Sequence, residues 1–65
     1  MRLLLNGASI DAEVRTLADL LESEGFGDAK VATAVNGTFV PAAERGQHEL
    51  HLGDAVEVLA PMQGG

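Results

Sequence analysis

Two Asn-Gly dipeptides, each between short apolar segments, constrain the fold of this chain more than any other feature. Asn6-Gly7 lies within residues 1–12, and Asn36-Gly37 lies within residues 31–40. Asn and Gly both tolerate the positive φ of a type I′ turn, whose twist matches two antiparallel strands. The chain is therefore expected to form two β-hairpins, and Pro41 should end the second because proline donates no ladder hydrogen bond. The expected strands are residues 1–5, 8–12, 31–35 and 38–40.

One helix is predicted between the hairpins, over residues 16–25. Thr16 is a favourable N-cap, and Asp19 is placed for a capping box and for a favourable interaction with the helix dipole. Gly25 suits the left-handed position after the helix, from which Phe26 can fold back in a Schellman arrangement. The apolar stripe of the helix consists of Leu17, Leu20 and Leu21.

The rest of the chain contributes one more strand and a tail. Residues 42–47 have the composition of a loop, Leu50 and Leu52 are expected to anchor a short turn to the core, and residues 55–59 alternate as a strand. A helix with one apolar stripe must cover one face of a single sheet. We therefore expect one α+β domain over residues 1–59, followed by a flexible C-terminal tail.

Composition excludes several classes of function. The 65 residues include no cysteine, which rules out disulfides, thiolate metal sites, a cysteine nucleophile and a side-chain persulfide. The net charge of −6 argues against nucleic acid as a partner. It suits docking on basic patches of other proteins, although solubility alone is an equal explanation. No apolar run approaches the roughly 20 residues of a membrane helix, and no signal peptide is visible, so a cytoplasmic location is expected.

No catalytic or metal site is predicted. His48 and His51 lie three residues apart in a polar stretch, without the further ligands that a metal needs, and solvated loop positions explain them better. The glycines around Phe26 follow a helix, whereas phosphate binding uses the N-terminal end of one. The chain is therefore expected not to be an enzyme.

The C-terminal tail, residues 60–65, is the candidate functional segment. Six extended residues reach about 20 Å. Gly64 and Gly65 carry no Cβ, so the terminal carboxylate can pass through a narrow channel into another protein's active site. Adenylation by ATP would turn that carboxylate into an electrophile. A flexible glycine end without chemistry, or an expression scar, is the alternative interpretation.

The chain resembles the β-grasp sulfur carriers, which are ubiquitin-like in fold, and most closely the ThiS family of thiamine biosynthesis. The resemblance spans nearly the whole chain. It rests on Asn6-Gly7, Thr16 to Leu21, Val35-Asn36-Gly37 with Val40-Pro41, Leu50 with Gly53 to Val58, and Gln63-Gly64-Gly65. It implies a mixed sheet of four to five strands packed on one main helix.

The resemblance also implies a reaction cycle on Gly65. A ubiquitin-activating-type (ThiF-like) enzyme would use ATP and Mg²⁺ to adenylate its carboxylate, while this chain would bind no cofactor itself. A cysteine-desulfurase relay would supply sulfur to give a thiocarboxylate, and a ThiG-like thiazole synthase would take that sulfur. Gly64, Gln63 and Met62 would thread into the partner.

A docking patch is the next expectation. Leu4, Phe39 and Leu59 can form one on the uncovered face of the sheet, although core packing is the role favoured for at least some of them, since apolar residues are mostly buried. Two departures from the family pattern leave partner specificity open. The loop of residues 13–15 lacks a glycine, and Arg45 stands where an aromatic residue is expected.

Three other functions stay open at this point. The small subunit of molybdopterin synthase also ends in Gly-Gly, although this chain is short for that family and Gln63 fits the thiamine carrier better. A ubiquitin-like protein modifier would join Gly65 to target lysines. A plain interaction module would use the fold alone and keep its partner without Gly65.

Overall fold

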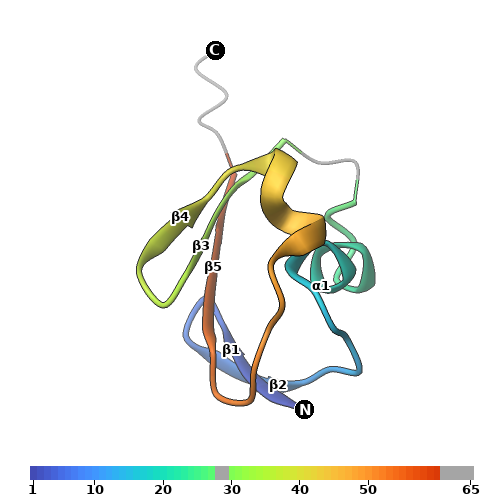
Figure 1. The fold of residues 1–65 in the computed structure, drawn as a ribbon. Helices are drawn as coiled ribbons and strands as arrows, with labels where there is room; N and C mark the ends of the chain where they lie inside the picture. The colour runs from blue at the N-terminus through green and yellow to red at the C-terminus, as the bar shows by residue number, and fades with distance from the viewer. Residues whose placement is uncertain (28–29, 61–65) are drawn as a thin grey trace.

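Within residues 1–27 and 30–60, which the computed structural model describes, five strands form one sheet in the order β2-β1-β5-β3-β4 (Figure 1). Neighbouring strands are antiparallel, except that β1 and β5 run parallel. The expected α+β fold with a mixed sheet is confirmed. The strands are β1 (Arg2–Leu5), β2 (Ala8–Asp11), β3 (Ala32–Val35), β4 (Thr38–Val40) and β5 (Ala55–Leu59).

Both hairpin turns have the predicted conformation. The φ angles are 50° and 85° at Asn6 and Gly7, and 51° and 84° at Asn36 and Gly37. Positive φ at both central residues defines the type I′ turn. The turns therefore set the register of both hairpins, in which Leu5 pairs with Ala8 and Val35 with Thr38.

The helix α1 (Leu17–Ser23) begins with the predicted capping box. Thr16 Oγ1 accepts a hydrogen bond from the Asp19 N–H at 3.1 Å, and Asp19 Oδ2 accepts one from the Thr16 N–H at 3.2 Å. The N–H of Arg15 also donates to Asp19 Oδ2, at 3.3 Å. Three otherwise unpaired N–H groups are satisfied in this way.

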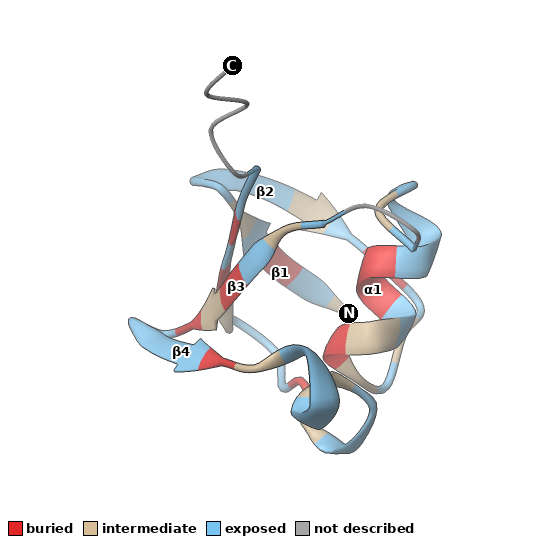
Figure 2. Cartoon of the chain, turned by 90° about the horizontal axis from the view of Figure 1, so that it is seen from above, coloured by how far each residue is buried: buried red, intermediate tan, exposed pale blue. Residues whose placement is uncertain are grey.

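The C-terminal end of α1 has the predicted Schellman arrangement. Gly25 has a φ of 86°, and the Phe26 N–H donates to the Leu21 carbonyl at 2.7 Å. The chain reversal at Gly25 places Phe26 against the core, which lies between α1 and the sheet (Figure 2). The buried core residues are Leu3, Ala12, Leu17, Leu20, Leu21, Val35, Val40, Leu50, Val56 and Val58.

Two expectations for the segment before β5 are wrong. The expected loop of residues 42–47 is a 3₁₀ helix, η1 (Ala42–Gln47). Pro41, with φ fixed at −63°, starts its first turn by accepting from the Glu44 N–H at 2.9 Å. Leu50 is buried as predicted, but Leu52 is 75% exposed, because it lies in the turn closed by the bond from the Asp54 N–H to the His51 carbonyl.

The strand β5 is held at both ends by the asparagines of the hairpin turns. At its start, Asn36 donates its N–H to the Ala55 carbonyl at 2.7 Å and accepts from the Ala55 N–H through Oδ1 at 2.9 Å. Toward its end, Asn6 Oδ1 accepts from the Val58 N–H at 2.8 Å. Since β1 ends at Leu5, the Asn6 side chain supplies the acceptor that a longer β1 would have offered.

Replacing Asn6 should therefore separate its two roles. Asn6→Gly keeps the positive φ but leaves the Val58 N–H without its acceptor, and it should lower the free energy of unfolding by about 1–2 kcal/mol. Asn6→Asp keeps an acceptor and should change it by less than about 0.5 kcal/mol. Urea denaturation measures both. Equal stability of Asn6→Gly and the wild type would show that the side-chain hydrogen bond contributes nothing.

The capping box predicts a pH dependence. The hydrogen bonds from the Thr16 and Arg15 N–H groups lower the pKa of Asp19 below its ordinary value of 3.8. A lowered folded-state pKa stabilises the fold above pH 3.8, and this contribution is lost as the pH falls through the folded-state value. The Tm deficit of Asp19→Asn should therefore be largest at neutral pH and shrink as the pH falls below 3.8.

A matched control removes the same charge from the other end of α1. Glu24→Gln should not lower Tm at neutral pH, because a carboxylate is unfavourable at the helix C-terminus. Thermal unfolding followed by circular dichroism measures both variants across the pH range. A Tm deficit of Asp19→Asn that does not change with pH would contradict the assignment.

Candidate functional site

The tail emerges from the centre of the sheet. Ala60, the last described residue, follows β5 directly, and β5 lies between β1 and β3. In Figure 1 this end of β5 points away from the N-terminus. The expected tail residues Met62, Gln63, Gly64 and Gly65, and with them the expected flexibility of the tail, lie outside the described residues.

The three expected docking residues are all exposed. Leu4, Phe39 and Leu59 have exposed fractions of 40%, 64% and 67%, so the favoured expectation that some of them pack in the core is wrong. Apolar side chains of this size rarely remain exposed as a group without a partner. Their part in docking stays a prediction.

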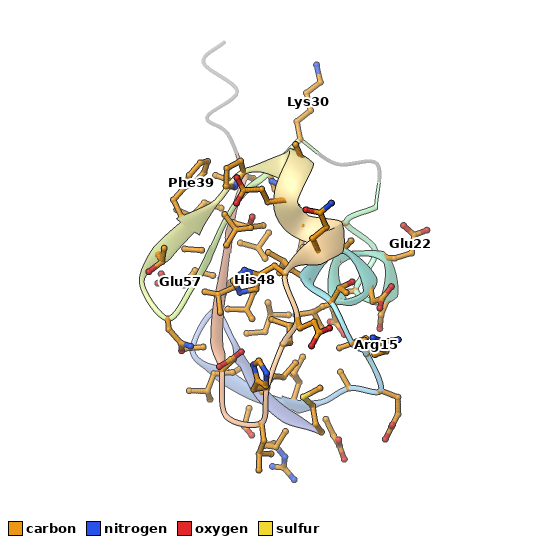
Figure 3. All side chains as sticks on the ribbon, viewed as in Figure 1. Arg15, Glu22, Lys30, Phe39, His48 and Glu57 are labelled. Atoms are coloured by element: carbon orange, nitrogen blue, oxygen red, sulfur yellow. The ribbon has the colours of Figure 1, made fainter. Side chains whose placement is uncertain are left out.

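These residues share the face of the sheet that α1 does not cover. Phe39 lies opposite Ala34, which in turn lies opposite Glu57, and Leu59 lies opposite Ala32. Figure 3 places Phe39 and Glu57 on the side of the sheet away from α1. We call this surface the uncovered face; it comprises Leu4, Ala32, Ala34, Phe39, Glu57 and Leu59. The small alanines between larger side chains leave a shallow surface that a flat partner can contact.

The two histidines belong to the loop before β5. The exposed His51 donates its backbone N–H to Asp54 Oδ2 at 2.9 Å, and Asn36 Nδ2 donates to Asp54 Oδ1 at 2.9 Å. Burial raises the pKa of Asp54, but these hydrogen bonds and the nearby His51 and His48 outweigh it and hold the pKa below its ordinary value. Asp54 thus ties the turn to the second hairpin.

Neither a metal site nor a membrane span is found in the part of the chain that the structure describes. Across residues 1–27 and 30–60, no three His, Asp or Glu side chains gather closely enough to hold a metal ion. No helix in these ranges is long and apolar enough to cross a bilayer.

Arg45, in the place where an aromatic residue was expected, joins η1 to β3. Its Nε donates to Thr33 Oγ1 at 3.0 Å, and its Nη2 donates to the Val31 carbonyl at 2.6 Å. Thr33 Oγ1 in turn donates to the Val40 carbonyl at 2.8 Å. Arg45 therefore joins η1 to β3 by hydrogen bonds, where an aromatic side chain would have done so by packing. The one sequence signal for these bonds is Thr33, a polar residue on the inward-facing side of a strand.

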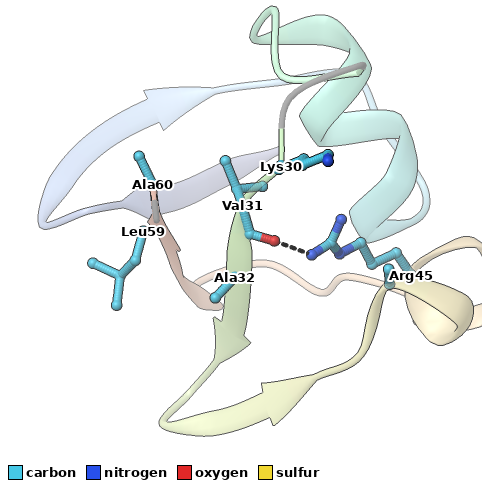
Figure 4. A pocket seen from close by; sticks show the side chains of 7 residues that line it. Lys30, Val31, Ala32, Arg45, Leu59 and Ala60 are labelled. Atoms are coloured by element: carbon cyan, nitrogen blue, oxygen red, sulfur yellow. Dashed lines mark hydrogen bonds between the residues drawn. The ribbon is translucent and has the colours of Figure 1, made fainter. Parts of the chain in front are cut away.

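A shallow hollow of ≈ 620 Å³ adjoins the root of the tail (Figure 4). Sequence analysis did not predict it, because its walls come from three separate segments. It is lined by Lys30, Val31, Ala32, Ala42, Arg45, Leu59 and Ala60. Leu59 and Ala32 belong to the uncovered face, so the hollow continues that surface to the exit of the tail.

Comparisons with known proteins agree with this architecture. A search of curated proteins finds no match. Among solved structures, the chain is similar to the thiamine biosynthesis protein ThiS from Geobacter metallireducens, with 28% sequence identity and a TM-score of 0.86. The similarity covers 100% of each chain. The model of the ThiS family matches residues 3–65, and this chain therefore belongs to the ThiS family.

Proposed function

We propose that this chain is a sulfur carrier that holds sulfur for thiazole formation in thiamine biosynthesis as a thiocarboxylate on Gly65. The observation that carries the proposal is that the ThiS family match runs through Gly65 and thus includes the tail. The position of β5 supports it, because this strand is hydrogen-bonded to β1 on one side and β3 on the other and so fixes the point where the tail begins. The absence of cysteine supports it as well, since sulfur can then be carried only at the terminus.

The chemistry belongs to a carboxylate and two partner enzymes. A ThiF-like enzyme with ATP and Mg²⁺ would join the Gly65 carboxylate to AMP and release pyrophosphate. The terminal sulfur of a persulfide on the cysteine-desulfurase relay would attack the acyl carbon and expel AMP. A thiol reductant would then cleave the resulting acyl disulfide and leave the thiocarboxylate. A ThiG-like thiazole synthase would then take the sulfur from the thiocarboxylate. The chain is thus a co-substrate and not the catalyst.

The tail and the uncovered face would act together. Gly64 and Gly65 allow the terminus to enter a narrow channel, while Gln63 and Met62 would line its entrance. The uncovered face would hold the partner against the sheet through Leu4, Phe39 and Leu59. The acidic surface, with a net charge of −6, suits enzymes that present basic patches.

Intact mass tests the carrier function. After incubation with ATP, a ThiF-like enzyme and a sulfur source, the chain should gain the mass difference between one sulfur and one oxygen. Deletion of Gly65 should abolish the gain. Gly64→Ala should block activation by steric hindrance and leave Tm unchanged, because the buried core of the described fold is formed by residues between Leu3 and Val58.

The remaining outcomes separate the other functions. No mass gain with an active, matched enzyme would reject the carrier and favour a protein modifier or a plain interaction module. A mass gain whose sulfur is accepted by a molybdopterin-synthase large subunit, and not by a ThiG-like enzyme, would reject the assignment to thiamine.

Exposed apolar residues test the docking face. Phe39→Ala should raise the KM for the chain in ATP–pyrophosphate exchange by the ThiF-like enzyme about tenfold, because it truncates a large exposed anchor. Leu52→Ala is the matched control, since Leu52 is at least as exposed as Phe39 but lies outside the uncovered face. The KM of this variant should stay within about twofold of the wild-type value. Equal KM values for the two variants would remove Phe39 from the docking face.

A further inference from the structure

The cationic side chains of this acidic protein are unevenly placed. The chain has ten Asp and Glu residues but only four Lys and Arg residues. Arg15 pairs with Glu49 at 3.7 Å, and Arg2 donates to Ser9 Oγ at 3.1 Å. The other two, Lys30 and Arg45, both line the hollow beside the root of the tail. Among the described residues, the lining of the hollow thus includes two cationic side chains and no carboxylate.

The walls of the hollow differ in character. Figure 4 shows Lys30 and Arg45 on one side of Val31, and Leu59 with Ala32 on the other. Arg45 is half-buried and oriented by its bonds to Thr33 and Val31, which use two of its five N–H donors. A fixed guanidinium at the edge of an apolar surface attracts an anion more strongly than a mobile, fully solvated one.

Neither Lys30 nor Arg45 forms an ion pair with a carboxylate of residues 1–27 or 30–60. Glu57 lies two residues before Leu59 on the uncovered face, so the charge of the surface changes sign between the middle of the sheet and the tail exit. A ligand with an apolar group next to a carboxylate fits this arrangement, whereas a cationic ligand does not.

We propose that the hollow receives an apolar side chain flanked by a carboxylate, both supplied by the ThiF-like adenylating enzyme. This inference rests on the proposed function. Five residues follow Ala60, so the terminal carboxylate lies within about 17 Å of the hollow along an extended chain. An enzyme that holds this carboxylate beside ATP must therefore pass close to the hollow. The hollow would set how the carrier is oriented on the enzyme, and the uncovered face would add contact area.

Charge reversal at Lys30 tests the inference, because Lys30 is exposed and makes no side-chain hydrogen bond to a described residue. Lys30→Glu should raise the Kd for the ThiF-like enzyme about tenfold at low salt, and added salt should shrink the difference. Arg15→Glu is the matched control: it makes the same change in net charge on the α1 side (Figure 3) and should raise Kd less than about twofold. Isothermal titration of the full-length chain measures both.

Two outcomes would overturn the inference. Equal Kd values for Lys30→Glu and Arg15→Glu would show that only net charge matters. Tighter binding of Lys30→Glu would show that the hollow holds the chain's own terminal carboxylate before the enzyme arrives. Either result, obtained while the wild-type chain still gains sulfur, leaves the proposed function intact. A wild-type chain that gains no sulfur with an active enzyme rejects the proposed function and this inference with it.

Discussion

The hydrogen bonds that two turn asparagines make to β5 are the interactions on which the rest of the structure depends. Asn6 reaches Val58 across 52 positions of sequence, and Asn36 reaches Ala55 across 19. Each asparagine has a positive φ that shapes its own hairpin and a side-chain oxygen that completes the bonding of a third strand. Because one residue type serves a local and a distant role, the same two positions set the hairpins and fix the strand from which the tail departs.

The features that could be predicted from sequence are those whose causes are local. The type I′ turns, the capping box of Thr16 and Asp19, and the Schellman end at Gly25 each follow from a few adjacent residues. The 3₁₀ helix η1, the exposure of Leu52 and the bond from Arg45 to Thr33 depend on contacts between distant segments. Leu4, Phe39 and Leu59 were predicted as docking candidates on the uncovered face, and the strand register places them there. The sequence could not exclude that some of them pack in the core, because alternation does not say which face of a strand is covered.

The sheet thus has two different sides. One side is closed by the aliphatic core under α1, where Leu3 and Val56 are fully buried. The other side carries small and apolar residues that nothing in the described chain covers, and it extends to the hollow beside Ala60. A protein of this size has little stability to spare for an internal cavity, so its exposed apolar residues lie on the outside of a minimal core.

The central position of β5 also affects how the protein is made. The strand β5 lies between β1 of the first hairpin and β3 of the second. The two hairpins are therefore joined in the sheet through the strand that leaves the ribosome last. Hairpins form within microseconds, but the pairing that unites them awaits residues 55–59. A prematurely terminated chain therefore lacks the continuous sheet as well as its C-terminal segment.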